Sequence, residues 1–256
     1  MEAHDWDAAS YERVGAPVRA FGLALLDRLE LRGDETVLDA GCGSGGVTRD
    51  LIDRVPDGRV IGIDASPSMI EQAREALGDA AEWRVGDLQE LELEEQVDVV
   101  FSSATFHWIP DHQLLFTRLF AALRPGGRLL AQCGGRGNIE AIVRALDAAG
   151  RESPFAEYLG GWAGPWNFAG PDETVGRLNR AGFVDTEAGL HVEPVHPDDP
   201  GEFLRTMILG AHLDRLPADM HDSLIRRVAG ELPEPPTIEY IRLTMSARRP
   251  PLFASG

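Results

Sequence analysis

The chain has 256 residues, of which 43% are hydrophobic and 26% charged, and this composition predicts one globular domain with a substantial core. Its formal charge of −18 disfavours binding to nucleic acids or to anionic membranes, because both carry negative phosphates. All 24 basic residues are arginine, so Schiff-base lysine chemistry and lysine-dependent phosphate loops are excluded. The two cysteines, Cys42 and Cys133, are too few for a secreted disulfide scaffold and predict a reducing cytoplasm.

Helices and strands alternate as far as residue 133. Apolar residues at helical spacing, including Phe21, Leu25 and Leu29, predict a first helix over residues 17–31. The further expected helices span 47–55, 69–77 and 113–123, and the expected strands span 36–40, 59–64, 82–85, 97–101 and 127–133. Continuous apolar strands joined by helices predict a doubly wound, mostly parallel α/β sheet that is covered on both faces.

The pattern changes after Cys133. Residues 154–171 are rich in aromatic side chains and glycine, which is typical of a lid over a substrate, although an ordinary secondary core fits the same residues. Helices are expected over 138–149, 173–181, 202–209 and 218–228, and strands over 183–192 and 237–247. We therefore expect a single domain made of an N-terminal helical cap at 1–33, a cofactor-binding core at 34–133, substrate-side helical elements at 134–182 and 194–236, and a final strand at 237–249.

A glycine-rich turn follows the first expected strand. Gly41, Gly43 and Gly46 fit the pattern G-x-G-x-x-G, in which glycine lets the backbone turn sharply and approach a ligand closely. The helix that follows would present free N–H groups to that ligand. The pattern alone is also compatible with a nicotinamide dinucleotide site.

Two acidic residues follow the next two strands. Asp64 ends the second strand, where a carboxylate can accept hydrogen bonds from ribose hydroxyls. Asp87 follows the third strand, where a carboxylate could accept a hydrogen bond from an adenine amino group. Helix capping by Asp64 and ordinary turn chemistry at Asp87 are the competing structural interpretations.

Taken together, the motifs resemble those of class I S-adenosylmethionine-dependent methyltransferases. Residues 37–45, which read VLDAGCGSG, are similar to the first motif of that family, and 63–69, 86–88 and 123–130 are similar to later ones. The resemblance covers residues 6–133 well and implies a Rossmann-like, seven-stranded enzyme that uses S-adenosylmethionine to methylate a small molecule. It also implies that the cofactor is held by Asp39, Gly41, Gly43, Asp64, Ala65, Met69, Asp87, Leu88 and Ser103.

Within that family, residues 103–112 resemble the trans-aconitate and small-molecule carboxylate methyltransferases. The resemblance implies a catalytic position for His107. It also implies an acceptor site lined by Trp6, Tyr11 and Trp108. Residues 15–17, Gly-Ala-Pro, depart from the group where a basic residue is expected, which argues against a tricarboxylate substrate.

Methyl transfer is an in-line displacement, so we expect catalysis mainly by positioning of a carboxylate or hydroxyl oxygen. A carboxylate is already ionised and needs no base, whereas a hydroxyl does. We therefore interpret His107 as a positioning group, with Arg136 and Arg177 as candidate partners of an acidic acceptor. The seven histidines show no metal-ligand spacing, so no metal site is expected. A nicotinamide-dependent oxidoreductase and a noncatalytic cofactor-binding protein of the same shape are the alternatives.

Overall fold

Seven strands form one sheet in the computed structural model, in which residues 13–252 are described. The strands are β1 (Thr36–Ala40), β2 (Arg59–Asp64), β3 (Glu82–Val85), β4 (Val97–Ser103), β5 (Leu123–Gly134), β6 (Val184–Val195) and β7 (Ile238–Arg248). Their order is β3-β2-β1-β4-β5-β7-β6, in which β7 is antiparallel to both neighbours and all other pairs are parallel. The order confirms the predicted doubly wound, mostly parallel sheet.

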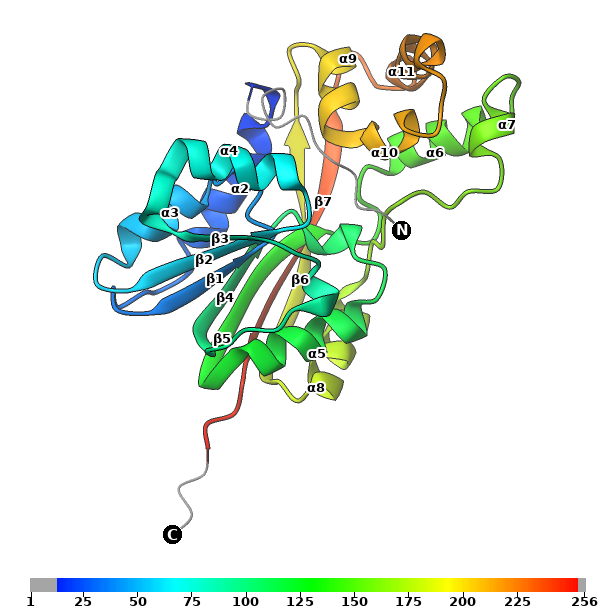
Figure 1. Cartoon of the computed structure of the whole chain (residues 1–256). Coiled ribbons are helices and arrows are strands. Elements are labelled where there is room, and N and C mark those ends of the chain that lie inside the picture. Colours follow the sequence, from blue (N-terminus) through cyan, green and yellow to red (C-terminus); the bar gives the residue numbers. More distant parts are fainter. Residues whose placement is uncertain (1–12, 253–256) are drawn as a thin grey trace.

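Helices cover both faces of this sheet. The helices of the described residues, which include those of a separate lobe, are α2 (Ala16–Leu26), α3 (Thr48–Arg54), α4 (Pro67–Leu77), α5 (His112–Ala122), α6 (Glu140–Ala149), α7 (Ala156–Leu159), α8 (Pro171–Ala181), α9 (Pro200–Phe203), α10 (Gly210–Leu213) and α11 (His221–Ala229). The shorter turns include η2 (Leu88–Glu90), η3 (Phe106–Trp108) and the π-helical η4 (Leu204–Ile208). Figure 1 shows α2, α3 and α4 over one face of the sheet, and α5 and α8 over the other.

Apolar packing on the two faces explains this layering. All five residues of β1 are buried, as expected for a central parallel strand that has helices on both sides. Leu26 and Leu51 pack with Phe101 on one face, and Phe116 and Leu119 belong to the core on the other. Burial of each such side chain contributes about 1.5–3 kcal/mol to folding, so the sheet has its own stable core.

Several element boundaries differ from the sequence prediction, and two of them have a clear local cause. The first helix ends at Leu26 instead of residue 31, because Leu29 already belongs to a tighter turn in which its N–H donates to the Leu26 carbonyl. The fifth strand begins at Leu123 instead of 127, because Leu123 pairs with β4 before residues 124–127 bulge out of register. Gly126, with φ of 83°, lies in that bulge.

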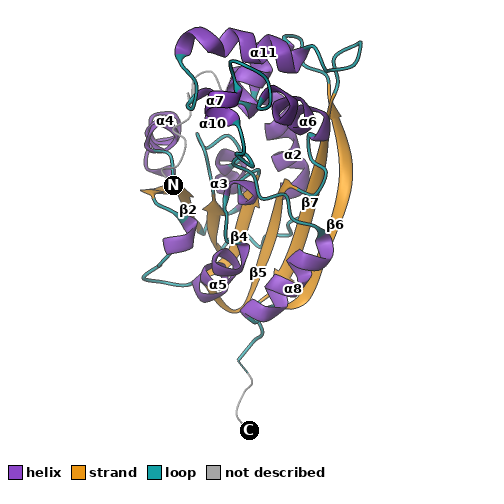
Figure 2. Cartoon of the chain, turned by 90° about the vertical axis from the view of Figure 1, so that its right-hand side faces the viewer, coloured by secondary structure: helices purple, strands orange, loops and turns teal. Residues whose placement is uncertain are grey.

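A helical lobe lies beyond the carboxyl ends of β1, β4 and β5 (Figure 2). It has a core of its own, to which α6 contributes Ile142 and Leu146, α11 contributes Leu224, and the lobe end of β7 contributes Tyr240. The sequence analysis did not predict α7 or α10, because a four-residue helix is too short to show a period. No helix among residues 13–252 is long and apolar enough to cross a bilayer.

Candidate active site

The glycines of the loop between β1 and α3 have different structural roles. Gly41 has φ of 82°, and a Cβ atom there would lie 2.0 Å from Oγ1 of Thr105, so this glycine makes room for a side chain of the protein itself. The Thr105 hydroxyl donates a hydrogen bond to the Gly41 carbonyl at 3.1 Å. Gly43 has φ of 54°, and among the described residues no atom beyond Gly43 and its two chain neighbours lies within 4 Å of its Cβ position. The space beside the loop is therefore filled by Thr105 at Gly41 and free at Gly43.

Asp64, the last residue of β2, fastens the open part of the loop. Its Oδ2 accepts a hydrogen bond from the Gly43 amide at 2.9 Å, and its Oδ1 accepts one from the Ser66 amide at 2.9 Å. Burial raises the pKa of Asp64, and the amide bonds oppose that rise. The carboxylate thus lies beside the open space at Gly43, which is where the sequence predicts ribose hydroxyls.

Asp39, near the carboxyl end of β1, is buried beneath the loop. Its side chain has an exposed fraction of 2%, and its Oδ2 accepts a hydrogen bond from the Thr48 hydroxyl at 2.7 Å. Burial raises the pKa of Asp39 to about 7; the Thr48 bond opposes this rise and the nearby Asp64 charge adds to it. Its carboxyl group therefore titrates near neutral pH in the protein without cofactor.

The remaining predicted cofactor residues lie at the carboxyl ends of β2, β3 and β4. Ala65 is exposed in the bend between β2 and α4, and Met69 is buried in the first turn of that helix. Asp87 caps η2 by accepting a hydrogen bond from the Gln89 amide at 2.8 Å, as its structural interpretation predicts. Leu88 is buried in the core, so its side chain faces away from the surface. Ser103, at the end of β4, lies against α2.

His107 lies in η3, directly after β4, and is buried. Its Nδ1 accepts a hydrogen bond from the Gly134 amide at 3.2 Å, which places the ring hydrogen of the neutral imidazole on Nε2. Burial, the Arg242 charge and His112 hold the pKa of His107 well below its ordinary value. Its ring stacks on Phe168, with centroids 5.9 Å apart. His107 is therefore a neutral hydrogen-bond donor with a fixed orientation.

Arg242 and Gly134 belong to this site, and the sequence analysis missed both. Arg242 is on β7 with an exposed fraction of 1%, and its Nε donates to Oε1 of Gln132 at 3.2 Å. Gly134 is opposite Arg242 in the sheet, and a Cβ atom there would lie 2.8 Å from the Phe168 ring. The glycine-rich stretch at residues 134–137 was a visible signal for the close approach at Gly134.

The other residues predicted for the acceptor site differ in their exposure and in whether they contact His107. Arg136 is 65% exposed and forms an ion pair with Glu173 at 2.8 Å, and Arg177 lies on α8, so neither takes the place of Arg242 beside His107. Trp108 is half-buried and packs on both His107 and Trp166. Trp6 and Tyr11 lie outside the described residues.

The cysteines do not have the properties of nucleophiles. Burial raises the pKa of the Cys133 thiol to about 12 and also raises that of Cys42, so both are protonated at neutral pH. In the part of the chain that the structure describes, no three His, Cys, Asp or Glu side chains are grouped as metal ligands.

Comparisons with known proteins agree with this geometry. Residues 37–127 match a family model described as a methyltransferase domain. The trans-aconitate 2-methyltransferase of Variovorax paradoxus is 33% identical over 233 residues, which span 86% of each chain. The YcgJ protein of Bacillus subtilis has a TM-score of 0.65 at 16% identity, over 90% of this chain and 98% of its own. Phosphoethanolamine N-methyltransferase 2 of Haemonchus contortus, solved with S-adenosylhomocysteine, has a TM-score of 0.58 at 23% identity, over 90% and 52% of the chains.

The glycine loop, the acidic residue that ends β2 and the strand order are those of an enzyme that binds a nucleoside cofactor. With the matches above, the chain belongs to the class I S-adenosylmethionine-dependent methyltransferases. Within that family it is similar over most of its length to the trans-aconitate 2-methyltransferase of Variovorax paradoxus. The predicted family, enzyme class and cofactor are confirmed, and the nicotinamide alternative is not supported. The open space at Gly43 beside a carboxylate fits S-adenosylmethionine.

Gly43 provides a direct test of the cofactor site. Gly43→Ala should leave a folded protein but weaken S-adenosylmethionine binding by at least tenfold, because the added methyl group occupies the open space. Gly78→Ala is the control: Gly78 also has a positive φ, 56°, and open space around its Cβ position, but lies at the far end of α4. Calorimetric titration of both variants measures the difference, and equal affinities would place the cofactor elsewhere.

The raised pKa of Asp39 predicts a pH-dependent stability. Between about pH 4 and pH 7 the folded protein keeps a proton that the unfolded chain releases, so the free energy of unfolding decreases as the pH rises through this window. Asp39→Asn removes this titration. The free energy of unfolding of Asp39→Asn minus that of wild type should therefore increase by about 1 kcal/mol or more as the pH rises from 5 to 8. Urea denaturation without cofactor measures it, and a constant difference between the two proteins would contradict the assignment.

Proposed function

We propose that the enzyme transfers a methyl group to a carboxylate oxygen of a small-molecule acid. The observation that carries this proposal is Arg242, a fully buried positive charge close enough to His107 to lower the pKa of that histidine. A guanidinium group can bind a carboxylate through two parallel hydrogen bonds, and the interaction is stronger where the local dielectric is low. Similarity to an enzyme named for trans-aconitate, which is itself a carboxylate, supports the same acceptor class.

The residues around the glycine loop would hold the cofactor. When bound, S-adenosylmethionine supplies a methyl group that is activated by a positively charged sulfur. Asp64 would accept hydrogen bonds from the ribose hydroxyls, and Gly43 would allow close approach of the backbone. Asp39 would contribute a buried carboxyl group beneath the loop. The other contacts, from Gly41, Ala65, Met69, Asp87, Leu88 and Ser103, stay predictions.

His107 would orient the acceptor by donating a hydrogen bond from Nε2. Its Nδ1 is already occupied by the Gly134 amide, so the ring has no free acceptor with which to remove a proton. A carboxylate acceptor needs no such removal, because it is ionised at neutral pH. Trp108, together with Trp6 and Tyr11, would form the wall of the acceptor site. Alignment of the reacting atoms can supply on the order of 7–11 kcal/mol of the barrier reduction.

Substitution of Arg242 tests the carboxylate assignment. Arg242→Gln should raise the KM for an acid acceptor by about 10–100-fold, since a charged hydrogen-bond partner is lost. Arg136→Gln, at the exposed ion pair with Glu173, should leave KM within about twofold and is the matched control. The assay follows isotope-labelled methyl groups into esters that mild alkali cleaves, and thermal stabilisation by S-adenosylmethionine confirms that each variant is folded. Labelling of alcohols or amines with no acid labelled would contradict the proposal.

Substitution of His107 separates positioning from base catalysis. His107→Gln should keep turnover within about tenfold of wild type, because glutamine can also donate a hydrogen bond. The pH–rate profiles of wild type and His107→Gln should have the same shape, since His107 stays neutral near pH 6.5 and a titration near pH 7 belongs to Asp39. A pH–rate profile of both proteins measures this. Loss of about 100-fold in turnover, together with loss of the acidic limb of the profile, would make His107 a general base.

A further inference from the structure

Polar side chains of neighbouring strands meet on the face of the sheet that α2 covers. Gln132 of β5 is aligned with Ser103 of β4 on one side and with Thr244 of β7 on the other. Residues two apart on one strand point to the same face, so Arg242 shares this face with Thr244. The Phe21 ring of α2 lies over the Arg242 guanidinium group. Gln132 therefore lies between the strand end predicted to approach the cofactor and the arginine proposed to bind the acceptor.

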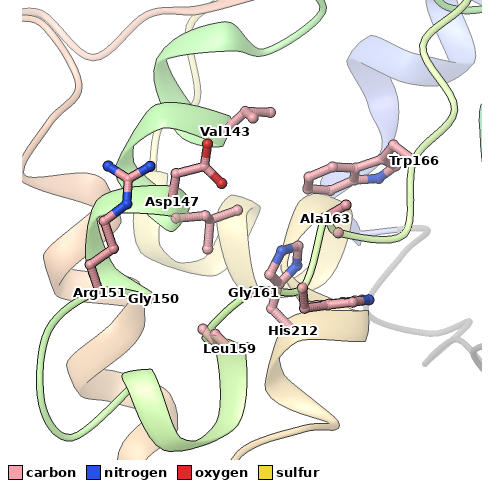
Figure 3. Close-up of a pocket in the computed structure, with 12 residues that line it drawn as sticks. Val143, Asp147, Gly150, Arg151, Leu159, Gly161, Ala163, Trp166 and His212 are labelled. Atoms are coloured by element: carbon pink, nitrogen blue, oxygen red, sulfur yellow. The ribbon is translucent and has the colours of Figure 1, made fainter.

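The lobe side of the proposed acceptor site is formed by aromatic rings. Phe168 stacks on His107, and Trp166 stacks on Phe168 with centroids 5.6 Å apart. Trp166 and His212 line a cavity of about 190 Å³ in the helical lobe (Figure 3). Neither His107 nor Arg242 belongs to the lining of that cavity. The stacked rings therefore lie between the cavity and the proposed acceptor site, which favours the sheet as the source of selectivity.

The side-chain amide of Gln132 is held in one orientation. Gln132 is 5% exposed, and its Oε1 accepts a hydrogen bond from Nε of Arg242 at 3.2 Å. Its Nε2 lies 3.3 Å from Oγ1 of Thr244 and 3.3 Å from Nε2 of His191. Arginine has donors and no acceptor, so a rotated amide would set an N–H group against the Nε–H group. The amide oxygen of Gln132 therefore faces Arg242, and its nitrogen faces the side chains from β6 and β7.

Two contacts fix the guanidinium group of Arg242. Gln132 holds its Nε, and the guanidinium carbon lies over the Phe21 ring, 5.2 Å from the centroid. With Gln132 at the Nε edge, a carboxylate that pairs through two parallel hydrogen bonds would bind the end edge, formed by Nη1 and Nη2. An arginine side chain has many rotamers, so the contact with Gln132 defines the direction in which this edge points.

The lack of charge on Gln132 matters as much as its hydrogen bond. An amide orients the guanidinium group without cancelling its positive charge. A carboxylate at residue 132 would instead form a buried ion pair with Arg242 inside the protein. Glutamate has nearly the shape of glutamine, so the identity of residue 132 can decide whether the arginine attracts an acid or is already paired.

We propose that Gln132 is a positioning residue, which orients the guanidinium group of Arg242 and leaves its charge to attract the carboxylate of the acceptor. This inference rests on the proposed function and identifies the residue that makes the site selective for acids. Gln132 acts on the acceptor only through Arg242.

Two substitutions at Gln132 separate charge from orientation. The kinetics use the acid that wild type labels fastest among butanoate, 3-phenylpropanoate, trans-aconitate and the acids of a metabolite extract. Gln132→Glu should raise KM for that acid by about tenfold or more and change kcat less, because the new carboxylate pairs with Arg242. Gln132→Met should instead lower kcat by about tenfold or more and change KM less than about threefold, because Arg242 keeps its charge but loses its orientation.

Gln113 is the matched control, because it makes the same kind of contact elsewhere. Its Oε1 accepts a hydrogen bond from Nε of Arg180 at 2.9 Å, and its Nε2 donates to the Arg177 carbonyl at 3.3 Å. These residues belong to α5 and α8, which cover the opposite face of the sheet from α2. Gln113→Glu and Gln113→Met should therefore leave KM and kcat within about twofold of wild type.

A double-mutant cycle shows whether Gln132 acts through Arg242. In an Arg242→Gln background there is no guanidinium group to orient, so Gln132→Met should change kcat by no more than about twofold. A merely structural role would lower kcat by the same factor in both backgrounds. The affinity for S-adenosylmethionine, measured by calorimetry, should stay within about threefold of wild type in every variant, which shows that each variant is folded.

The outcomes distinguish the inference from the proposed function. If acids are methylated and Arg242→Gln raises KM, but Gln132→Glu has no larger effect than Gln113→Glu, Gln132 is not a positioning residue and the carboxylate function stands. Equal effects of Gln132→Met in the two backgrounds also overturn the inference. If no acid of the panel or the extract receives a methyl group that mild alkali releases, the proposed function fails, and the inference fails with it.

Discussion

The hydrogen bond from the Gly134 amide to Nδ1 of His107 is the contact on which the proposed acceptor site depends. It joins the end of β5 to the turn after β4, and it fixes both the tautomer and the orientation of the imidazole. The missing side chain at Gly134 leaves the space that the Phe168 ring occupies. The Gly134 amide therefore leaves the imidazole of His107 one hydrogen-bond donor, Nε2–H, and no free acceptor nitrogen. The missing side chain at Gly134 also determines how closely the segment with Phe168 approaches the sheet.

The cofactor half of the protein is readable from the sequence because its signals are local. The first three strands have the bounds that the sequence predicts, since each is a short run of apolar or strand-forming residues between turn-forming ones. Asp39 and Asp64 could be singled out because they lie at or near strand ends, and the carboxyl ends of parallel strands meet at one edge of the sheet. The sequence does not reveal that the glycines of the loop have different roles. Gly41 must lack a side chain because Thr105, 64 residues further along the chain, occupies the space beside it.

The proposed acceptor site is harder to predict from the sequence, because the burial of its residues depends on which side of a strand other elements cover. In β7, apolar residues occupy every second position after Arg242, at Leu243 and Met245. Such alternation usually indicates a strand whose polar side faces solvent. Here that side is covered by α2, and the guanidinium group lies over the Phe21 ring of that helix. No local pattern distinguishes the buried Arg242 from Arg136, which forms an exposed ion pair. From the sequence alone, Arg136 is an equally plausible candidate for binding an acidic acceptor. The contact of Phe168 with His107 likewise joins segments that only the tertiary fold brings together.

The position of β7 between β5 and β6 has a consequence for how the enzyme is made on the ribosome. Among the strands that the structure describes, β6 pairs only with β7, so residues 184–195 have no such partner until residues 238–248 have been synthesised. At about 5–20 residues per second, that interval lasts roughly several seconds. The strands that flank the glycine loop are complete long before, whereas Arg242 is synthesised with β7. A nascent chain can thus assemble the cofactor half first, and the arginine proposed to bind the acceptor joins the sheet only later.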